Sequence, residues 1–383
     1  MLLRSELPVT TTRQQRIVAE LLEECGVAVN GGQDHDITVH HDSFYGRVLR
    51  GGSLALGESY MDGLWDCKRI DEFITRLLTE RIQQRVGRSA WEIALDIGSV
   101  ALNLQNHVRS LMVGKQHYDV GNELYESMLD SYMNYSCGYW DDAADLEQAQ
   151  RNKLELICRK LELKPGMKVL DIGCGWGGVA KYAAENFDVQ VTGITISQKQ
   201  KELAEARCQG LPVDIKFEDY RDTQGQFDRI VSVGMFEHVG YKNYRRFFQK
   251  CSELLHPGGL LLLHTIGSNR TMTRGDPWLS KYIFPNGMLP SVAQIGEAVE
   301  KYFMMEDWHN FGPDYARTLA AWYENVNKAW PRLEKQYSER FKRMWDYYLL
   351  CCVAMFRSRH GQLWQVVFSK RPRTQIYHRP VLG

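Results

Sequence analysis

The amino-acid sequence predicts an α/β protein with a mostly parallel sheet and a small, mostly helical domain in front of it. Residues 167–186, MKVLDIGCGWGGVAKYAAEN, have the pattern of a short apolar strand, a glycine-rich turn and an amphipathic helix. After this unit, apolar runs of strand length alternate with stretches of helical periodicity, which is typical of a parallel sheet. Residues 1–105 show helical periodicity without such a unit. We therefore expect two domains, 1–105 and 106–383.

Composition argues against several classes of protein. Hydrophobic residues make up 44% of the 383-residue chain and charged residues 25%, as in globular proteins, so disorder is not expected. The 47 basic and 47 acidic residues cancel, which argues against a nucleic-acid-binding protein. The nine cysteines form no C-x-x-C pair, so no metal site is expected, and a reducing cytoplasm is favoured. No apolar run approaches the length of a membrane span, so we expect contact with a membrane only at its surface.

The N-terminal region is expected to be mostly helical, with a hydrophobic core of its own. Residues 12–25 have helical spacing that ends at Gly26, and residues 71–87 return to that spacing. Between them, residues 36–67 combine a short strand signal with glycine turns. Residues 91–112 are apolar with few charges. This favours a helix packed in a core or between domains, which would link the N-terminal domain to the next, over one that enters the lipid headgroups. A protein that meets lipid only at the surface needs a contact region, and we expect the N-terminal domain, 1–105, and this helix to contribute to it.

Residues 117–140, HYDVGNELYESMLDSYMNYSCGYW, combine many aromatic and polar side chains without a clear period. A segment that only packed in a core would show a period, so we expect a loop that covers a ligand. Residues 146–163 follow as a helix that leads into the strand before the glycine-rich turn.

The rest of the chain alternates strands with helices. The expected strands are 189–197, 213–222, 227–240, 258–268 and 362–370, and the expected helices are 199–210, 318–330 and 338–358. Residues 269–312 are expected to form a long insertion rich in aromatic residues, glycine and proline. Parallel sheets bind ligands at the C-terminal ends of their strands, so polar residues at those ends are the candidate site.

The glycine-rich turn indicates where a cofactor binds. Gly173, Gly175 and Gly177 let the backbone turn tightly and leave bare peptide groups against which a ligand can lie at a helix N-terminus. Such a turn is weak evidence alone, because many doubly wound domains have one. Asp171, just before the turn, favours a cationic ligand over the pyrophosphate of a dinucleotide. It therefore argues against NAD.

Motifs at the predicted strand ends point to a family. YDVGN, NYSCGYW, VLDIGCGWGG, GITISQKQ, GMFEHVG, LLHTIGS, YIFPNG and QLWQVVFS together resemble the bacterial cyclopropane-fatty-acyl-phospholipid synthases, which are related to the mycolic acid cyclopropane synthases. The resemblance spans almost the whole chain. It implies the seven-stranded, Rossmann-like fold of S-adenosylmethionine-dependent methyltransferases, and methylene transfer from S-adenosylmethionine to the cis double bond of an unsaturated phospholipid acyl chain. It also implies a homodimer in the cytoplasm, at the inner face of the membrane.

The resemblance also implies the cofactor residues. They are Tyr135, Ser136, Asp171, Gly173, Gly175, Gly177, Thr195, Gln200, Asp219 and Tyr220. The second strand lacks the acidic residue that binds the ribose hydroxyls in the general methyltransferase pattern, and in this family Thr195 and Gln200 take its place. Asp219 and Tyr220 are expected near the adenine.

The reaction itself needs a base that acts late. An alkene has no proton to lose before it attacks the sulfonium methyl, so orientation governs the first step. Methylation leaves a carbocation, and ring closure then requires loss of a proton from the new methyl group in a water-poor pocket. A bare carboxylate could be alkylated by that cation. Glu237 and His264 follow predicted strands that end at the cofactor, which makes them candidates to organise this step.

In the family, the positions of Glu237, His264 and Tyr315, with Cys137 and the backbone of Ile266, hold a bicarbonate ion that accepts the proton. The resemblance implies that Glu237 accepts the hydrogen of the ion and that His264 and Tyr315 donate to its oxygens. Cys137 and Ile266 would donate through their backbone N–H groups.

Cys352 matches a family cysteine that is sometimes assigned to the active site. The mechanism gives a thiolate no clear task, and a cysteine in an apolar helix is usually a small core side chain, so both interpretations stay open.

Two other functions also stay open. The same cofactor could serve a fatty-acid C-methyltransferase that leaves a methyl or methylene branch, or the protein could be a lipid-binding module without catalysis. The intact glycine-rich turn and Glu237 argue against the second.

Overall fold

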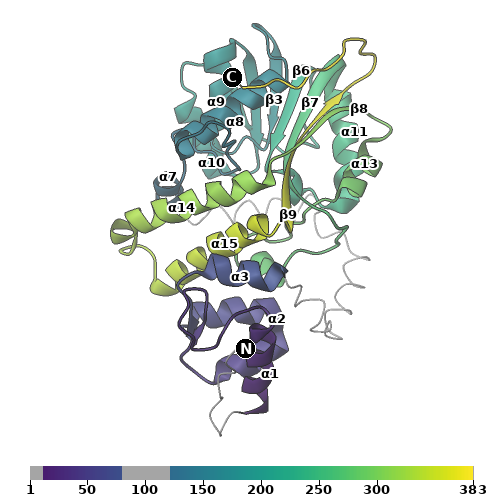
Figure 1. The fold of residues 1–383 in the computed structure, drawn as a ribbon. Coiled ribbons are helices and arrows are strands. Elements are labelled where there is room, and N and C mark those ends of the chain that lie inside the picture. The colour runs from purple at the N-terminus through teal and green to yellow at the C-terminus, as the bar shows by residue number, and fades with distance from the viewer. Residues whose placement is uncertain (1–11, 80–120, 383) are drawn as a thin grey trace.

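A seven-stranded sheet forms the centre of the computed structural model, which describes residues 12–79 and 121–382 (Figure 1). Its strands are β3 (Lys168–Ile172), β4 (Gln190–Thr195), β5 (Val213–Phe217), β6 (Phe227–Val233), β7 (Leu255–Ser268), β8 (Met304–Asn310) and β9 (Gly361–Ser369). They are ordered β5-β4-β3-β6-β7-β9-β8. All are parallel from β5 to β7, and β9 is antiparallel to both of its neighbours. The predicted mostly parallel, seven-stranded α/β fold is confirmed.

Helices cover both faces of this sheet. Their bounds are α7 (Asn122–Met128), α8 (Leu146–Lys160), α9 (Gly178–Phe187), α10 (Gln198–Arg207), α11 (Tyr244–Leu254), α12 (Pro277–Tyr282), α13 (Val292–Val299), α14 (Gly312–Leu333) and α15 (Glu339–Arg357). On β7, Leu260 and Leu262 share a hydrophobic cluster with α8 and α9, whereas Leu261 and Leu263 share one with α11 and α13. Successive side chains of a strand point to opposite faces, so the apolar run in β7 is buried by both layers.

The segment 269–312, predicted as a long insertion, contains regular secondary structure and a strand of the sheet. It contains α12, α13 and the strand β8, which pairs with β9 at the edge of the sheet. The sequence of β8, MMEDWHN, mixes charged and apolar residues, and Met304 and Met305 are exposed. An edge strand needs no buried face along its whole length, so its local pattern is weak. Backbone pairing with β9 identifies it as a strand.

The N-terminal part is mostly helical, as predicted. Its elements are α1 (Arg13–Glu23), β1 (Thr38–Val39), α2 (Ser43–Met61), β2 (Trp65–Asp66) and α3 (Ile70–Thr79). The helix predicted at 12–25 is confirmed, and α3 matches the start of the one predicted at 71–87. The end of the latter and the helix predicted at 91–112 lie outside the described residues, as does the domain boundary predicted at residue 105.

The helix α2 corrects the prediction of glycine turns within residues 36–67. Gly57 lies inside α2, and a Cβ atom at this position would lie 2.5 Å from the ring of Trp278 in α12. Gly57 therefore allows a close contact between helices rather than a turn. Only Gly52, with φ +53°, interrupts the helical backbone and marks a kink. Gly63, with φ +72°, does lie in a turn after α2, so the prediction holds there and is wrong for Gly57. Glycine has the same appearance in a sequence in both roles.

Within residues 12–79, the N-terminal helices share their hydrophobic core with α14 and α15, whereas the prediction gave them one of their own. They pack against α15, from the other end of the chain (Figure 1). Tyr60 stacks on Tyr347 of α15 with ring centroids 5.7 Å apart, and the guanidinium group of Arg343 lies 3.9 Å from the centroid of the Tyr60 ring. One hydrophobic core runs from α1 through α15 to α14. The N-terminal part thus supports the helices that reach the cavity described next.

Candidate active site

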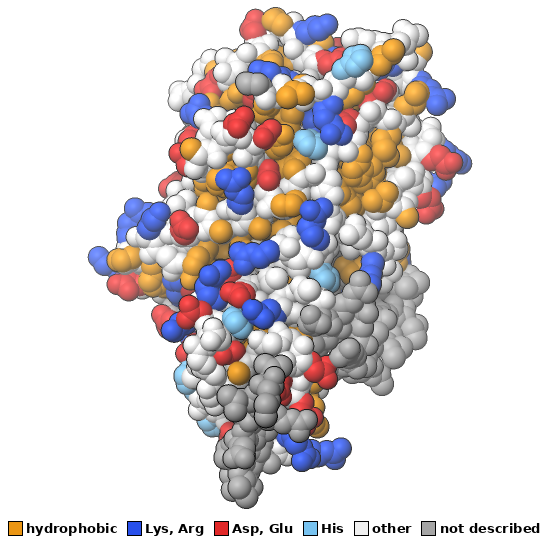
Figure 2. All heavy atoms as spheres, in the orientation of Figure 1, with side chains coloured by type: hydrophobic (Ala, Val, Ile, Leu, Met, Phe, Trp, Pro, Cys, Tyr) orange, Lys and Arg blue, Asp and Glu red, His pale blue; other side chains and the backbone are white. Residues whose placement is uncertain are grey.

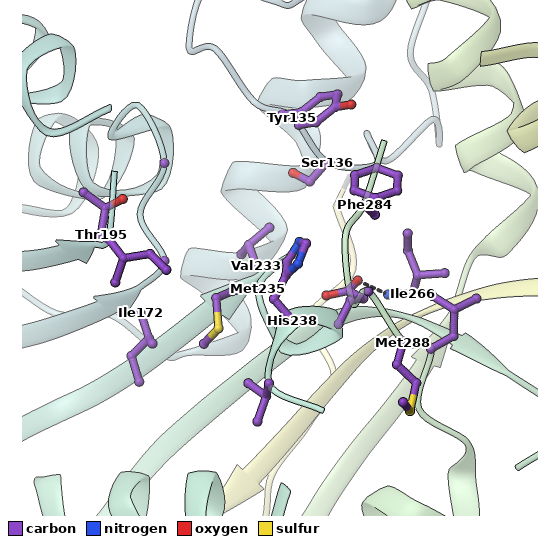
Figure 3. Close-up of a pocket in the computed structure, with 18 of the residues that line it drawn as sticks. Tyr135, Ser136, Ile172, Thr195, Val233, Met235, His238, Ile266, Phe284 and Met288 are labelled. Atoms are coloured by element: carbon purple, nitrogen blue, oxygen red, sulfur yellow. Dashed lines mark hydrogen bonds between the residues drawn. The ribbon is translucent and has the colours of Figure 1, made fainter. Parts of the chain in front are cut away.

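A cavity of about 380 Å³ opens at the C-terminal ends of the parallel strands. We call one part of it the cofactor end, lined by Asp171, Gly173, Gly175, Thr195, Gln200, Asp219 and Tyr220. We call the other part the apolar end, lined by Leu279, Phe284, Tyr315, Leu319, Tyr348, Cys352, Met355 and Phe356. Figure 3 shows Ile172 and Thr195 on one side, Ile266 and Met288 on the other, and His238 between them.

The glycine-rich turn leaves open space at the cofactor end. Gly175 has φ +54°, and a Cβ atom built on it would meet no described atom within 4 Å, because it would point into the cavity. Gly173 has φ +81°, and its Cβ would collide with Met235. Gly177, in contrast, does not line the cavity. It precedes α9 with φ +82° and faces Ala204 of α10, so it serves the start and packing of the helix rather than the ligand.

Asp171 is a buried carboxylate with one unused oxygen. Its exposed fraction is 1%, and Oδ2 has no hydrogen-bond partner among the residues that the structure describes. Burial raises the pKa of Asp171 to about 7, although the positive charge of Lys153 opposes this shift. A cationic group bound beside Oδ2 would compensate for the burial of the carboxylate. The ammonium group of S-adenosylmethionine has the charge that this position requires.

The residues predicted at the ribose and adenine also lie at the cofactor end. Thr195 Oγ1 donates a hydrogen bond to Gln200 Oε1 at 2.9 Å. The carboxylate of Asp219 accepts hydrogen bonds from the guanidinium group of Arg221, at 2.7 Å from Nε and 2.6 Å from Nη2. Tyr220 lines the cavity beside this ion pair. The structure brings these residues together, and their contacts with a ligand stay a prediction.

The segment 117–140 is only partly the covering loop that its composition suggests. Its first described residues form the helix α7, which is buried through Leu124 and its neighbours. From the loop that follows, Tyr135 and Ser136 do line the cavity (Figure 3). The hydroxyl groups of Tyr135 and Tyr348 are hydrogen-bonded at 2.7 Å. The loop is therefore a fixed wall, joined to α15, rather than a separate cover.

Glu237 lies between the two ends of the cavity. After β6 the chain forms a short 3-10 helix, Phe236–His238, which places the Glu237 side chain on the cavity wall. Its Oε1 accepts a hydrogen bond from the backbone N–H of Ile266 at 2.7 Å (Figure 3), and its buried Oε2 has no partner in the described part of the chain. Burial raises the pKa of Glu237 to about 7, against the effect of the hydrogen bond from Ile266.

The structure differs from the predicted bicarbonate site at three residues. The N–H of Ile266, predicted to bind the ion, donates to Glu237 instead. Neither His264 nor Cys137 lines the cavity. His264 Nδ1 lies 3.3 Å from Gln365 Nε2, and burial lowers the pKa of His264 well below its usual range, so the ring is neutral. Cys137 is fully buried behind the wall. His264 lies within β7 rather than after it, and a position in a strand does not show by itself which face of the sheet the side chain takes.

Tyr315 and Cys352 lie at the apolar end. Tyr315, from α14, packs against Phe356 of α15 with ring centroids 4.6 Å apart. Cys352 is also on α15, and burial raises the pKa of its thiol to about 12. The thiol therefore stays protonated near neutral pH, which favours its interpretation as a small wall side chain over that of a nucleophile.

His238 is a cavity residue that the sequence argument missed. Its ring lies in the cavity, 6.2 Å from the ring of Phe284 (Figure 3). Nδ1 is buried and has no partner among described residues, and burial lowers the pKa of His238 to about 4. Its position beside Glu237 in the GMFEHVG motif was a signal that could have found it. Phe284 lies in the YIFPNG motif and Met288 directly follows it, so this motif was the signal that could have found them.

Figure 2 shows basic and acidic side chains intermixed on the viewed face, in agreement with the balanced charge of the chain. Within residues 12–79 and 121–382, no helix has the length and apolar character needed to cross a bilayer. In the same two ranges, no group of three or more His, Cys, Asp or Glu side chains could hold a metal ion.

Comparison with known proteins supports the interpretation of this cavity. Residues 105–366 match the family described as mycolic acid cyclopropane synthetase. The chain is 54% identical over 365 residues to a cyclopropane-fatty-acyl-phospholipid synthase of Escherichia coli (strain K12). This match covers 95% of this chain and 96% of the Escherichia coli protein. It is 33% identical over 355 residues to a probable fatty acid methyltransferase of Pseudomonas putida, with 87% and 86% covered. Among solved structures, the mycolic acid cyclopropane synthase CmaA1 complexed with SAH and CTAB matches with a TM-score of 0.63 and 31% identity, over 68% of this chain and 98% of that one.

Proposed function

The chain belongs to the mycolic acid cyclopropane synthetase family and is an S-adenosylmethionine-dependent cyclopropane synthase of unsaturated lipids, and we propose that its substrates are the acyl chains of membrane phospholipids. The observation that carries this proposal is the joined cavity. One end has open space at Gly175 and an unpaired carboxylate oxygen on Asp171, and the other is walled by apolar side chains.

The apolar end fits an acyl chain. Its wall combines aromatic and aliphatic side chains from α12, α14 and α15 with residues of the 269–312 segment. Such a wall excludes water. A carbocation intermediate requires this water-poor environment. S-adenosylmethionine, bound at the cofactor end, supplies the carbon that is transferred. Glu237 and the neutral His238 line the cavity, and Figure 3 shows His238 between Thr195 on one side and Met288 on the other.

We further propose that a bicarbonate ion accepts the proton lost at ring closure. Glu237 Oε2 and His264 Nε2 are both buried and have no hydrogen-bond partner within the described residues. Buried polar atoms are rarely left unpaired, so a small hydrogen-bonding ion beside Glu237 would satisfy a real need. Ile266 could take part only if its N–H left Glu237, and His264 only if the wall beside it opened.

We also propose that the protein works at the bilayer surface, in the cytoplasm, as a homodimer. The N-terminal region and residues 91–112 remain the predicted lipid-contacting part. Because Tyr60 packs on Tyr347, removal of the N-terminal region would uncover α15, so the test uses the whole chain. Co-sedimentation with vesicles of unsaturated phospholipid, and light scattering for the oligomer, are expected to show binding and a dimer. A monomer that stays in the supernatant would contradict this proposal.

The test of the activity uses vesicles of unsaturated phospholipid and methyl-labelled S-adenosylmethionine. We expect acyl chains that have gained one CH₂ unit and show cyclopropane protons in their NMR spectra. A methylene-branched chain has the same mass without those protons, and a saturated methyl branch carries two further hydrogens. Either branched product would favour a fatty-acid methyltransferase, the function suggested by the Pseudomonas putida relative. Unlabelled lipid would overturn both.

A further inference from the structure

Arg221 forms an ion pair with Asp219 on the wall of the cofactor end. Both residues line the cavity, and their side chains are only 10% and 5% exposed. The guanidinium group of Arg221 reaches both oxygens of the carboxylate, Oδ1 from Nε at 2.7 Å and Oδ2 from Nη2 at 2.6 Å. A bidentate contact of this kind fixes the plane of a carboxylate as well as its position. The arginine therefore holds Asp219 in one orientation.

A tight turn after β5 brings the two side chains together. The backbone N–H of Arg221 donates to Asp219 Oδ1 at 3.0 Å, and the backbone N–H of Asp222 donates to the carbonyl oxygen of Asp219 at 2.9 Å. The guanidinium carbon of Arg221 lies 5.5 Å from the centroid of the Tyr220 ring. A change of the Arg221 side chain leaves the two backbone contacts in place, so it can be made without removing the turn.

The place of this pair in the cavity indicates which part of the cofactor it meets. Asp171 lies near the end of β3, Thr195 ends β4, and Asp219 follows β5, which are three neighbouring strands. Adjacent strands are about 4.8 Å apart, so the wall from β3 to β5 spans about 10 Å. A cofactor that has its ammonium group beside Asp171 and extends along these strand ends places its purine beside Asp219 and Tyr220.

The 6-position of a purine distinguishes the two partners of this ion pair. Adenine has a 6-amino group, which donates hydrogen bonds, and hypoxanthine has a 6-oxo group, which accepts them. An ionised carboxylate only accepts and fits the amino group, whereas a guanidinium group only donates and fits the oxo group. A carboxylate has about four acceptor sites, so one that is held by an arginine can also accept from a ligand. Asp219 is thus the partner suited to adenine.

We propose that Arg221 is a positioning residue that keeps Asp219 ionised and oriented as the acceptor for the 6-amino group, and thereby determines the selectivity for adenine. The proposal deepens the proposed function and rests on it in taking S-adenosylmethionine as the cofactor. Without a cationic partner, a buried carboxylate tends to bind a proton. A protonated carboxyl group donates as well as accepts, so it would no longer distinguish a 6-amino group from a 6-oxo group.

Calorimetric titration with S-adenosylhomocysteine and S-inosylhomocysteine tests this role, because the two ligands differ in having a 6-amino or a 6-oxo purine. We expect the wild type to bind the first at least about tenfold more tightly, as for a hydrogen bond to a charged group. In Arg221→Met, the Kd for S-adenosylhomocysteine should rise roughly tenfold while that for S-inosylhomocysteine stays or falls. Arg221→Lys keeps the charge without the planar fork, so it should show an intermediate preference.

Arg373→Met is the matched control. The Arg373 side chain is 6% exposed and donates from Nη2 to both carboxylate oxygens of Glu162, at 2.8 Å and 3.0 Å, but neither residue lines the cavity. The substitution removes a similar ion pair at another place. It should lower the stability and leave the preference for S-adenosylhomocysteine unchanged. A loss of that preference in the control would contradict the specific role of Arg221.

Asp219→Asn tests the acceptor itself, because an amide both donates and accepts, and we expect it to lose the preference. The proposal is wrong if this variant or Arg221→Met keeps the wild-type preference, or if Arg221→Met weakens both ligands equally. If Arg221→Met does not fold, Arg221→Lys decides, and a full preference there would refute the need for the guanidinium fork. A wild type that binds both ligands equally would overturn this inference alone, whereas one that binds neither ligand nor S-adenosylmethionine would overturn the proposed function.

Discussion

The two ends of the cavity are built in different ways. The cofactor end comes from the last residues of β3 and β4 and from the segments that follow β3, β4 and β5, so its wall residues lie in a strand or shortly after one. The apolar end is assembled from α12, α14 and α15, and α15 in turn rests on the N-terminal helices. The first is a local structure and the second a product of the whole fold. Changes far from the cavity should therefore affect lipid chemistry more than cofactor binding.

The largest expected effect comes from filling the cofactor end. In Gly175→Val, a branched side chain would enter the open space of the cavity and would also strain a backbone with φ +54°. We expect S-adenosylmethionine binding to be abolished in calorimetric titration while the circular dichroism spectrum is retained. Gly210→Val is the matched control. Like Gly175, Gly210 has a positive φ, here +83°, and open space around it, but it does not line the cavity. Undiminished affinity in folded Gly175→Val would remove the turn from the site.

The next effect concerns the point where the two ends meet. Glu237→Gln keeps the shape of the side chain but cannot carry the charge that accepts the hydrogen of a bicarbonate ion. Turnover should fall by roughly a hundredfold, as for a lost acid–base group, while the Kd for S-adenosylmethionine barely moves. The comparison is made in bicarbonate-depleted and bicarbonate-supplemented buffer at fixed pH, with a separate measurement of bound ion. Full activity of the variant in either buffer would refute the role of Glu237.

The pH dependence of the wild type sharpens the same point. Burial raises the pKa of Glu237 to about 7, and the ionised form is the one proposed to work. Activity that depends on the carboxylate should therefore be present above about pH 7 and decline as the pH falls through that value. Because Asp171 titrates in the same range, turnover is measured at saturating cofactor. Glu237→Gln should lack this decline, and an identical pH profile in the two proteins would contradict the assignment.

A smaller effect should follow from loosening the support of the apolar end. Arg343 donates to the carbonyl oxygen of Trp65 at 2.9 Å and to Asp66 at 2.6 Å, and it covers the ring of Tyr60. Arg343→Met should lower the free energy of unfolding by about 1–3 kcal/mol, because these contacts to a charged group are lost. We expect turnover on lipid to fall several-fold with unchanged cofactor affinity. Equal losses at both ends would mean that they are not independent.

The smallest effect is expected at Cys352. With a thiol pKa near 12, this residue is a neutral part of the apolar wall, so Cys352→Ala should change turnover by no more than about threefold. Leu319→Ala, at the same end of the cavity, is the control for loss of wall volume. A loss of turnover near a hundredfold in Cys352→Ala alone would restore the interpretation of Cys352 as a catalytic residue.

The sequence by itself determined the parallel sheet, the glycine-rich turn and the family. These depend on neighbouring residues: the strand into Asp171, the turn at Gly173 and Gly175, and the GMFEHVG motif are each continuous in the chain. Backbone conformation and side-chain periodicity are local properties, so a local pattern predicts them well.

Only the tertiary structure decided what lies opposite each residue. Gly57 has the same appearance in a sequence whether it turns the chain or admits Trp278, and β8 is a strand because β9 lies beside it. His264 and His238 both lie near the C-terminal ends of predicted strands, yet only His238 faces the cavity. Packing partners and side-chain direction come from segments far apart in the chain, and this is why the cofactor end was largely predictable whereas the apolar end and the shared core were not.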